Sequence, residues 1–160
     1  MSDYWNAIPQ LAADLSEVRA LMDEAARRAD FPAADSLAAL VSAGGKMLRP
    51  AFLLVASRFG KPDRARLLKL AAAVELLHTA TLIHDDIIDG SDTRRGVPSV
   101  HARYGQTVAV LSGDLLFARC FRLAGEHASP ANARLLARLV ETICVAEVRQ
   151  DLSAFDFKIG

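Results

Sequence analysis

The sequence predicts an all-α protein, and three observations support this fold class. Apolar residues recur at intervals of three and four along most of the chain, which is the spacing of amphipathic helices. Glycine, proline and capping residues divide this pattern into segments of helical length. Apolar and polar residues never alternate for more than a few positions, so no β-strand is expected. We therefore expect a single all-α domain over residues 1–160.

Three helices are expected in the first part of the chain. The first covers residues 8–29, where an apolar stripe repeats with helical spacing. A short helix through residues 37–41 runs into Gly44 and Gly45, because a glycine pair is a natural helix stop. The third covers residues 50–58 and ends at the next glycine.

The longest helical pattern covers residues 64–89 and is rich in alanine and leucine, which favour helices. Asp63 offers a capped start for it. Residues 90–104 contain glycine, proline and several polar residues, which is typical of a loop with about one helical turn. Two further helices are expected at residues 106–126 and 130–155, the second after a Ser-Pro pair that favours helix initiation.

Composition excludes several classes of function. Lysine plus arginine and aspartate plus glutamate each number 19, so the net charge is zero and no overall field favours nucleic acid or an anionic membrane. Two cysteines are too few for a disulfide scaffold, and the N-terminus lacks a basic segment followed by an apolar stretch. We therefore expect a cytoplasmic protein. Charges interrupt every apolar run, so no transmembrane segment is expected.

The densest group of charges lies at the end of the longest predicted helix, in the segment HDDIIDGSDTRRG. Asp85 and Asp89 are one helical turn apart and leave the same face, with Asp86 about 60° round from Asp89. Like charges at this spacing repel unless cations lie between them, and hard oxygen ligands suit Mg²⁺. An EF-hand is excluded, because Ile87 or Ile88 occupies a position that needs an oxygen ligand. The alternative is a solvated acidic run, which is common at protein surfaces.

The same helix carries a column of residues that leads to the aspartates. Val74, His78, Thr81, Asp85 and Asp89 follow one another at intervals of three and four. The helix could therefore line a deep pocket for a ligand with a charged head and an apolar tail. The alternative is that Val74 and Thr81 are core residues and that His78 is a buried histidine with satisfied hydrogen bonds.

Two basic groups could bind phosphate. Arg94 and Arg95 supply planar, permanently charged forks directly after the aspartates. In GGKMLRP, a glycine pair lets the backbone approach an anion, and Lys46 and Arg49 can converge on it. Taken alone, the second pattern is also typical of an ordinary helix end followed by two basic residues.

The segments GGKMLRP, LLHTATLIHDDIID and SDTRRG, in this order and spacing, resemble the trans-isoprenyl diphosphate synthases, or polyprenyl synthetases. The resemblance is detailed over residues 39–118 and looser to Gln150. It implies a helical bundle of the isoprenoid synthase type, of which this chain carries roughly the first half. It also implies a Mg²⁺-dependent prenyltransferase that condenses isopentenyl diphosphate with an allylic diphosphate. In that reaction diphosphate departs, the double bond of isopentenyl diphosphate attacks the allylic cation, and a proton is lost.

The same resemblance assigns roles to individual residues. It implies catalytic roles for Asp85, Asp86, Asp89 and Arg94, with Asp85 and Asp89 as the direct Mg²⁺ ligands and Arg94 on the allylic diphosphate. The residues implied to bind isopentenyl diphosphate are Gly45, Lys46, Arg49, His78 and Arg95, and Gln150 is matched more weakly to the floor of the site. The small residues Ala80 and Thr81 stand where the family sets product length, so we expect a product longer than farnesyl.

The resemblance also predicts what this chain needs. This chain contains no second aspartate-rich motif, which in the family faces the first. We therefore expect it to be a fragment of a longer synthase or a natural half that needs another subunit. We further expect a homodimer or a partner subunit, because the last helices would expose apolar faces. A non-catalytic or regulatory subunit is the stronger rival function. A metal phosphohydrolase of the HD type fits poorly, because His78, the only upstream histidine, lies on the same helix.

Overall fold

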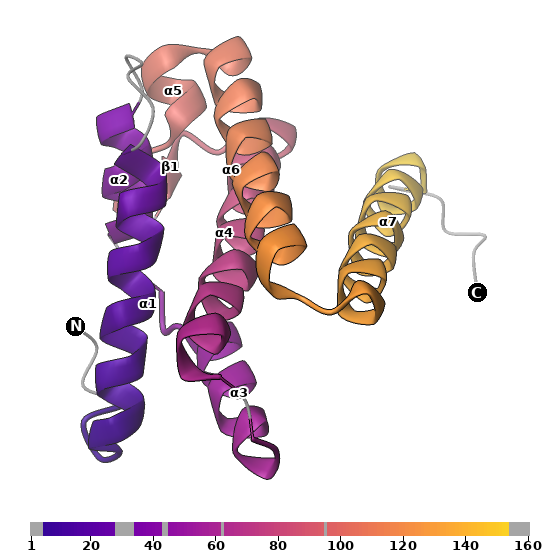
Figure 1. The fold of residues 1–160 in the computed structure, drawn as a ribbon. Helices are drawn as coiled ribbons and strands as arrows, with labels where there is room; N and C mark the ends of the chain where they lie inside the picture. Colours follow the sequence, from indigo (N-terminus) through magenta and orange to yellow (C-terminus); the bar gives the residue numbers. More distant parts are fainter. Residues whose placement is uncertain (1–4, 28–33, 43–44, 62, 95, 154–160) are drawn as a thin grey trace. The chain divides into compact units, whose positions relative to one another are not determined.

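The computed structural model describes residues 5–27, 34–42, 45–61, 63–94 and 96–153 (Figure 1). The chain contacts divide it into two compact units, residues 1–127 and residues 128–160. The first unit holds nearly all the described helices, and the second holds one long helix. The expectation of a single domain stays a prediction.

The described residues are almost entirely helical, which confirms the all-α class. The α-helices of the first unit are α1 (Pro9–Arg27), α2 (Ala34–Ser42), α3 (Leu48–Ala56), α4 (Arg64–Ile88), α5 (Val100–Tyr104) and α6 (Gln106–His127). A 3-10 turn, η2 (Ser57–Phe59), follows α3, and two short strands, β1 (Thr93–Arg94) and β2 (Val97–Pro98), precede α5. The helix of the second unit is α7 (Pro130–Leu152).

Helix α4 is the centre of the first unit, because it packs against α1, α3 and, most extensively, α6. Its buried alanines, Ala71, Ala72 and Ala80, let the neighbouring backbones approach closely. Leu76 of α4 and Leu116 of α6 are completely buried in the shared core. Burial of each such leucine contributes about 1.5–3 kcal/mol, so this packing fixes the direction of α4 and therefore the place where it ends.

Capping residues fix the starts of the helices, as the sequence predicts. The Asp63 carboxylate accepts hydrogen bonds from the backbone N–H groups of Ala65 (2.8 Å) and Arg66 (3.3 Å) at the start of α4. The hydroxyl of Ser129 accepts from Asn132 N–H in the same way at the start of α7. These caps explain why both long helices begin within a residue of their predicted positions.

Two local predictions are wrong. Helix α3 begins at Leu48, two residues before the predicted start, because Met47 takes a left-handed conformation (φ 53°) and lets the chain turn into the helix early. The segment after α4 contains an antiparallel pair, β1 with β2, where no strand was expected. Each strand has two residues, which is too short for alternation to show in a sequence, and Gly96 supplies the positive φ of the turn.

By length and composition, α4 is also apolar enough to cross a membrane, over a window of 18 residues. Charged residues such as Lys69 and Glu75 do interrupt this stretch, as expected, and the absence of a transmembrane segment stays a prediction. Of that window, 56% is buried inside the protein. The core helices of globular proteins pass the same test, so this pattern fits the central position of α4 in the first unit.

Helix α7 exposes apolar side chains along much of its length. The exposed large apolar residues are Leu135, Leu139, Ile143, Val145, Val148 and Leu152. No residue of α7 is buried among those that the structure describes. This agrees with the expectation that the last helix presents apolar faces.

The two cysteines differ in burial, which predicts different reactivity. Cys120 is completely buried on α6, and burial raises the pKa of its thiol to about 11, whereas Cys144 on α7 is exposed. Because the thiolate is the reactive form, a thiol reagent at pH 8 should label one cysteine of the native chain and both in denaturant. Mass spectrometry of the labelled peptides should identify Cys144 as the fast site. Equal labelling of both cysteines in the native chain would contradict this packing.

Candidate functional site

The end of α4 presents two of the three aspartates to solvent. The helix ends at Ile88, and Asp89 caps it by donating its backbone N–H to the carbonyl of Asp85 at 2.8 Å. The Asp85 side chain is half-buried and that of Asp89 is exposed. As expected from their spacing, the two carboxylates lie one turn apart on the same side of the helix.

Asp86 points into the protein instead. It is only 2% exposed, and its Oδ1 accepts hydrogen bonds from Arg94 Nε at 2.7 Å and from Arg94 Nη2. The bond to Asp86, more than the charges of the neighbouring aspartates, raises the pKa of the Arg94 guanidinium. Asp86 and Arg94 therefore form an ion pair, with a buried carboxylate and a half-buried guanidinium, that the sequence alone did not predict.

The segment after α4 is folded back onto the end of the helix by several further hydrogen bonds. The backbone N–H of Ser91 donates to the carbonyl of Asp86 at 2.8 Å, and a ring nitrogen of His101 bonds the carbonyl of Ser91 at 2.8 Å. The N–H of Ser99 donates to the carbonyl of Asp92 at 2.9 Å, beside the β1–β2 pair. These bonds fix the backbone that carries Arg94.

The residue column along α4 is not part of the closed core. Val74, His78 and Thr81 are all half-buried, whereas Leu77 and Ala80 beside them are buried. The Thr81 hydroxyl donates to the carbonyl of His78 at 2.8 Å, as is common within a helix. Val74 and Thr81 are therefore not closed core residues of this unit. Their column keeps partial exposure next to the aspartates. Ala80 and Thr81, which the family resemblance links to product length, differ in burial: Ala80 is packed into the core, whereas Thr81 is half-buried.

The basic segment before α3 has a firmly held backbone. The carbonyl of Gly45 accepts from Arg19 Nη2 at 3.0 Å, and that of Lys46 accepts from Trp5 Nε1 at 2.8 Å. Between Lys46 and Arg49, the side chain of Met47 is buried in the core and is only 3% exposed. The side chains of Lys46 and Arg49 are both exposed, at the start of a helix that packs against α4.

Two predicted residues cannot be related to this site. Arg95 lies outside the described residues. Gln150 lies on α7, in the other compact unit, where its side chain is exposed.

Sequence reasoning missed a contact next to the aspartates. The imidazole of His84 lies over Gly113 of α6, where a side chain would overlap it, since a Cβ there would be 2.2 Å from Nε2. The same Nε2 is 3.1 Å from the carbonyl of Val110 and 3.6 Å from the carboxylate of Asp114. The available signal was Gly113 itself, because a glycine inside a helix destabilises it and marks a close approach.

The accessible carboxylates fit a magnesium ion that also binds substrate. Among the residues that the structure describes, no group of three or more His, Cys, Asp or Glu side chains is arranged to hold a metal ion. Asp85 and Asp89 offer two hard oxygen donors, however, and Mg²⁺ commonly takes one or two carboxylates and completes its shell with water and substrate phosphates. This donor set therefore suits a cation bound together with a phosphorylated ligand.

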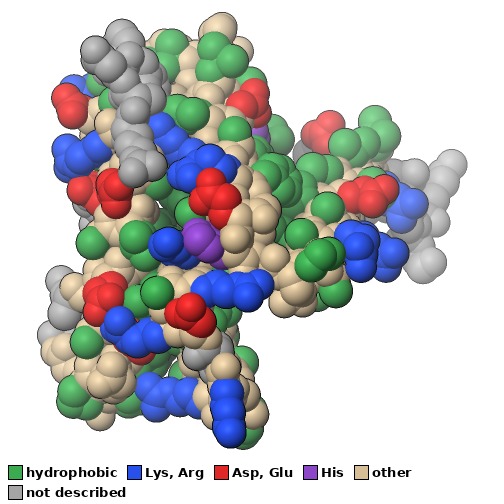
Figure 2. Space-filling view, viewed as in Figure 1, with side chains coloured by type: hydrophobic (Ala, Val, Ile, Leu, Met, Phe, Trp, Pro, Cys, Tyr) green, Lys and Arg blue, Asp and Glu red, His purple; other side chains and the backbone are tan. Residues whose placement is uncertain are grey.

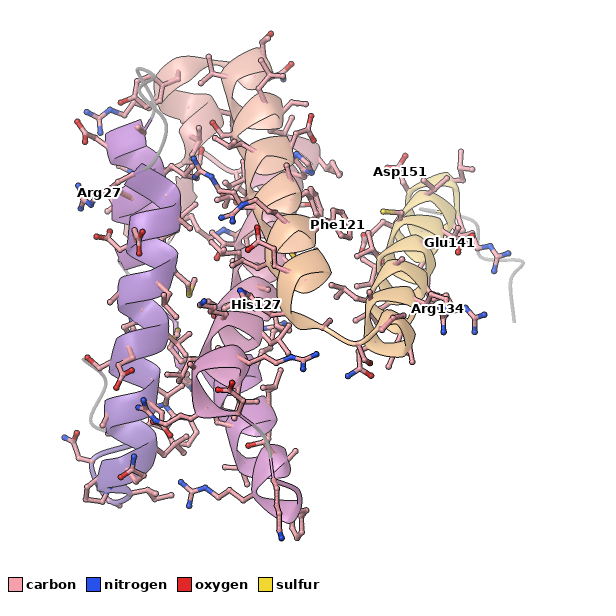
Figure 3. All side chains as sticks on the ribbon, viewed as in Figure 1. Arg27, Phe121, His127, Arg134, Glu141 and Asp151 are labelled. Atoms are coloured by element: carbon pink, nitrogen blue, oxygen red, sulfur yellow. The ribbon has the colours of Figure 1, made fainter. Side chains whose placement is uncertain are left out.

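A pocket of about 250 Å³ lies elsewhere in the first unit, between α1, α4 and α6. Its lining residues are Leu21, Glu24, Ala25, Lys69, Ala72, Arg122, Leu123, Glu126 and His127, the last of which is labelled at the end of α6 in Figure 3. Lys69 precedes Asp85 by roughly 24 Å along α4, so this pocket is remote from the aspartates. Basic and acidic side chains are interspersed on the face of this unit shown in Figure 2.

Comparison with known proteins gives a consistent result. The family model described as polyprenyl synthetase matches residues 33–158. Heptaprenyl diphosphate synthase component 2 of Geobacillus stearothermophilus is 37% identical over 147 residues, which is 92% of this chain and 46% of that protein.

Solved structures agree. A geranylgeranyl pyrophosphate synthase from Lactobacillus brevis superposes with a TM-score of 0.92 at 32% identity, over 98% of this chain and 49% of the other. A polyprenyl synthase from Caulobacter crescentus, complexed with calcium and isoprenyl diphosphate, superposes with a TM-score of 0.87 at 39% identity, over 96% and 47%. The chain thus spans about half the length of the relatives that it matches.

Proposed function

Because this chain belongs to the polyprenyl synthetase family, we propose that it carries the first half of a synthase that joins isopentenyl diphosphate to an allylic diphosphate. The product we propose is a polyprenyl diphosphate longer than farnesyl. One observation carries the proposal: Asp85 and Asp89 are accessible, one turn apart, at the head of a half-buried column on α4. Such a surface suits a ligand with a diphosphate head and a prenyl tail.

The residues of this chain would bind and orient the allylic substrate. Asp85 and Asp89 would hold Mg²⁺, which when bound supplies the positive charge that stabilises the departing diphosphate. The Arg94 guanidinium would contact the same diphosphate and share its developing charge. The half-buried Val74 and Thr81 would lie along the prenyl tail and keep water from the reacting carbon.

Isopentenyl diphosphate would bind on the basic side of the site. Lys46 and Arg49 are exposed, and their backbone is held by Trp5 and Arg19, which suits a fixed phosphate cradle. Gly45, His78, Arg95 and Gln150 complete the proposed set on the basis of the family resemblance alone. A protein nucleophile is not needed, since the leaving diphosphate can accept the proton that is lost.

We propose that activity requires the other half of the fold, as a longer chain or as a partner subunit. The Geobacillus relative is named as a component 2, which supports a second subunit as one form of this arrangement. The exposed apolar residues of α7 also support self-association or a partner. A regulatory role is the second candidate, and a cytoplasmic location is proposed from the cysteine content alone. An HD-type phosphohydrolase is set aside, because the family is a different one.

The experiment compares this chain with a version extended to the length of its relatives. Each is incubated with Mg²⁺, labelled isopentenyl diphosphate and farnesyl diphosphate, and extracted prenyl products are counted. Incorporation by the extended chain alone supports the proposal. If neither chain incorporates label but the short chain binds an allylic diphosphate in Mg²⁺, the regulatory function is supported instead.

Product length provides a further prediction. In a competent chain, Thr81→Phe should shorten the main product by one or more isoprene units, because the ring would block the half-buried column below Asp85. Chromatography of the dephosphorylated products measures this directly. Leu82→Phe is the matched control, since its side chain leaves α4 about 100° away from Thr81 and should leave the product unchanged. An unchanged product from Thr81→Phe would show that the tail does not follow this column.

A further inference from the structure

We propose that Asp86 is a positioning residue that holds Arg94, and that it does not bind the metal. The three aspartates of the HDDIID segment would then have two separate tasks: Asp85 and Asp89 bind the cation, and Asp86 fixes an arginine. This inference rests on the proposed function and refines the roles within that site. The sequence interpretation already took Asp85 and Asp89 as the direct Mg²⁺ ligands and gave Asp86 a catalytic role without a partner; the added step is that Asp86 holds Arg94.

Burial and bonding separate Asp86 from its neighbours. Its side chain is 3% exposed, against 28% for Arg94, so the carboxylate lies inside and the guanidinium reaches the surface. Nε and Nη2 of Arg94 both donate to the same oxygen, Oδ1, of Asp86. A buried carboxylate bonded in this way would have to break both bonds and turn outward before it could reach a cation beside Asp89.

The Arg94 guanidinium can still donate hydrogen bonds to a ligand while Asp86 holds it. Arginine carries five N–H donors in a planar fork, and two of them point to Asp86 Oδ1. The other donors, including both on Nη1, can meet phosphate oxygens from the exposed edge. Because one edge of the guanidinium is held by a buried acceptor, the Arg94 side chain loses less conformational entropy when it binds a phosphate than an unrestrained arginine would.

The backbone around Arg94 is held independently of any ligand. Arg94 pairs with Val97 in the β1–β2 ladder, and Ser91 N–H donates to the Asp86 carbonyl at 2.8 Å. His101 holds Ser91 from the next helix, α5. The loop and the ion pair therefore place the guanidinium at the end of α4 before substrate arrives, which is the requirement for a preorganised phosphate donor.

A double-mutant cycle tests this role. The probe is the thiolo analogue of farnesyl diphosphate, which cannot ionise readily, and its binding to the chain is measured by calorimetry over a range of Mg²⁺ concentrations. We expect Asp86→Asn to weaken binding about tenfold without moving the Mg²⁺ midpoint. Arg94→Gln should weaken binding at least as much. The affinity of the double variant for the analogue should equal that of Arg94→Gln within about twofold. Asp89→Asn serves as the contrast and should move the midpoint to higher Mg²⁺.

Two results would overturn the proposal. One is a shift of the Mg²⁺ midpoint by Asp86→Asn similar to that caused by Asp89→Asn. The other is a double variant whose loss equals the product of the two single losses, since independent residues behave in that way.

A ligand-free measurement separates this proposal from the proposed function. If neither the native chain nor the version extended to the length of its relatives binds the thiolodiphosphate, the proposed function fails, and the ion pair is then judged from the Arg94 Nε–H signal in a proton–nitrogen NMR spectrum. A signal protected from exchange that disappears in Asp86→Asn supports the positioning role. A signal that exchanges rapidly in the native chain, or that Asp86→Asn leaves unchanged, contradicts it. Circular dichroism of each variant confirms that the helices remain.

Discussion

Replacing Asp85 or Asp89 with asparagine is expected to lower kcat/KM for prenyl transfer by on the order of 10²–10³-fold, about 2.7–4 kcal/mol of transition-state stabilisation. Asparagine keeps the shape of the side chain but removes the charge that holds the cation. Asp89 is exposed and Asp85 is half-buried, and asparagine fills the same space as aspartate, so the expected loss comes from the missing charge rather than from disturbed packing. Incorporation of labelled isopentenyl diphosphate by a competent chain measures the effect.

Asp92→Asn is the matched control for this prediction. Asp92 is exposed three residues beyond Asp89, and its hydrogen bond with Ser99 uses the backbone carbonyl, which the substitution leaves intact. Its rate should stay within about twofold of the native rate, as expected for a surface substitution. If Asp85→Asn and Asp89→Asn both show the native rate at saturating Mg²⁺, the assignment of these residues as metal ligands is wrong.

A large effect on stability is expected from Gly113→Ala. The added Cβ would lie 2.2, 2.6 and 2.9 Å from three atoms of the His84 ring, so the ring must leave its place against α6. Overpacking of this kind costs about 1–3 kcal/mol, and the better helix propensity of alanine returns up to about 1 kcal/mol. At the middle of these two ranges, the free energy of unfolding in urea should fall by about 1.5 kcal/mol.

Two companion variants identify the cause. Gly125→Ala lies on the same helix with no atom within 4 Å of the new Cβ, so it should raise the free energy of unfolding by about 0.5–1 kcal/mol. In a His84→Ala background, Gly113→Ala should lose its cost, because the overlapping ring is gone. If Gly113→Ala behaves like Gly125→Ala in the native background, the contact between His84 and Gly113 does not constrain the two helices.

The placement of the helices could be predicted because their signals are local. Asp63 caps its own helix, and the spacing of Asp85 and Asp89 determines their common face whatever surrounds the helix. The predicted end of α1 at residue 29 and the predicted stop of α2 at Gly44 lie outside the described residues. Short-range chemistry was thus sufficient for the main elements and for the accessible carboxylates.

The interior partners could not be predicted, because they depend on how distant segments return to α4. A helical wheel gives the direction of Asp86 but not the hairpin that brings Arg94 back to it. Similarly, the contact of His84 with Gly113 depends on the register between α4 and α6. Each contact joins residues whose sequence separation carries no periodic signal.

The most direct test of the magnesium–diphosphate site at the end of α4 is the binding of farnesyl thiolodiphosphate to the native chain, with Mg²⁺ and with EDTA. Binding should require Mg²⁺, and it should be lost when Asp85 is replaced by asparagine. Equal affinity in EDTA, or full Mg²⁺-dependent affinity in Asp85→Asn, would contradict the assignment of this site.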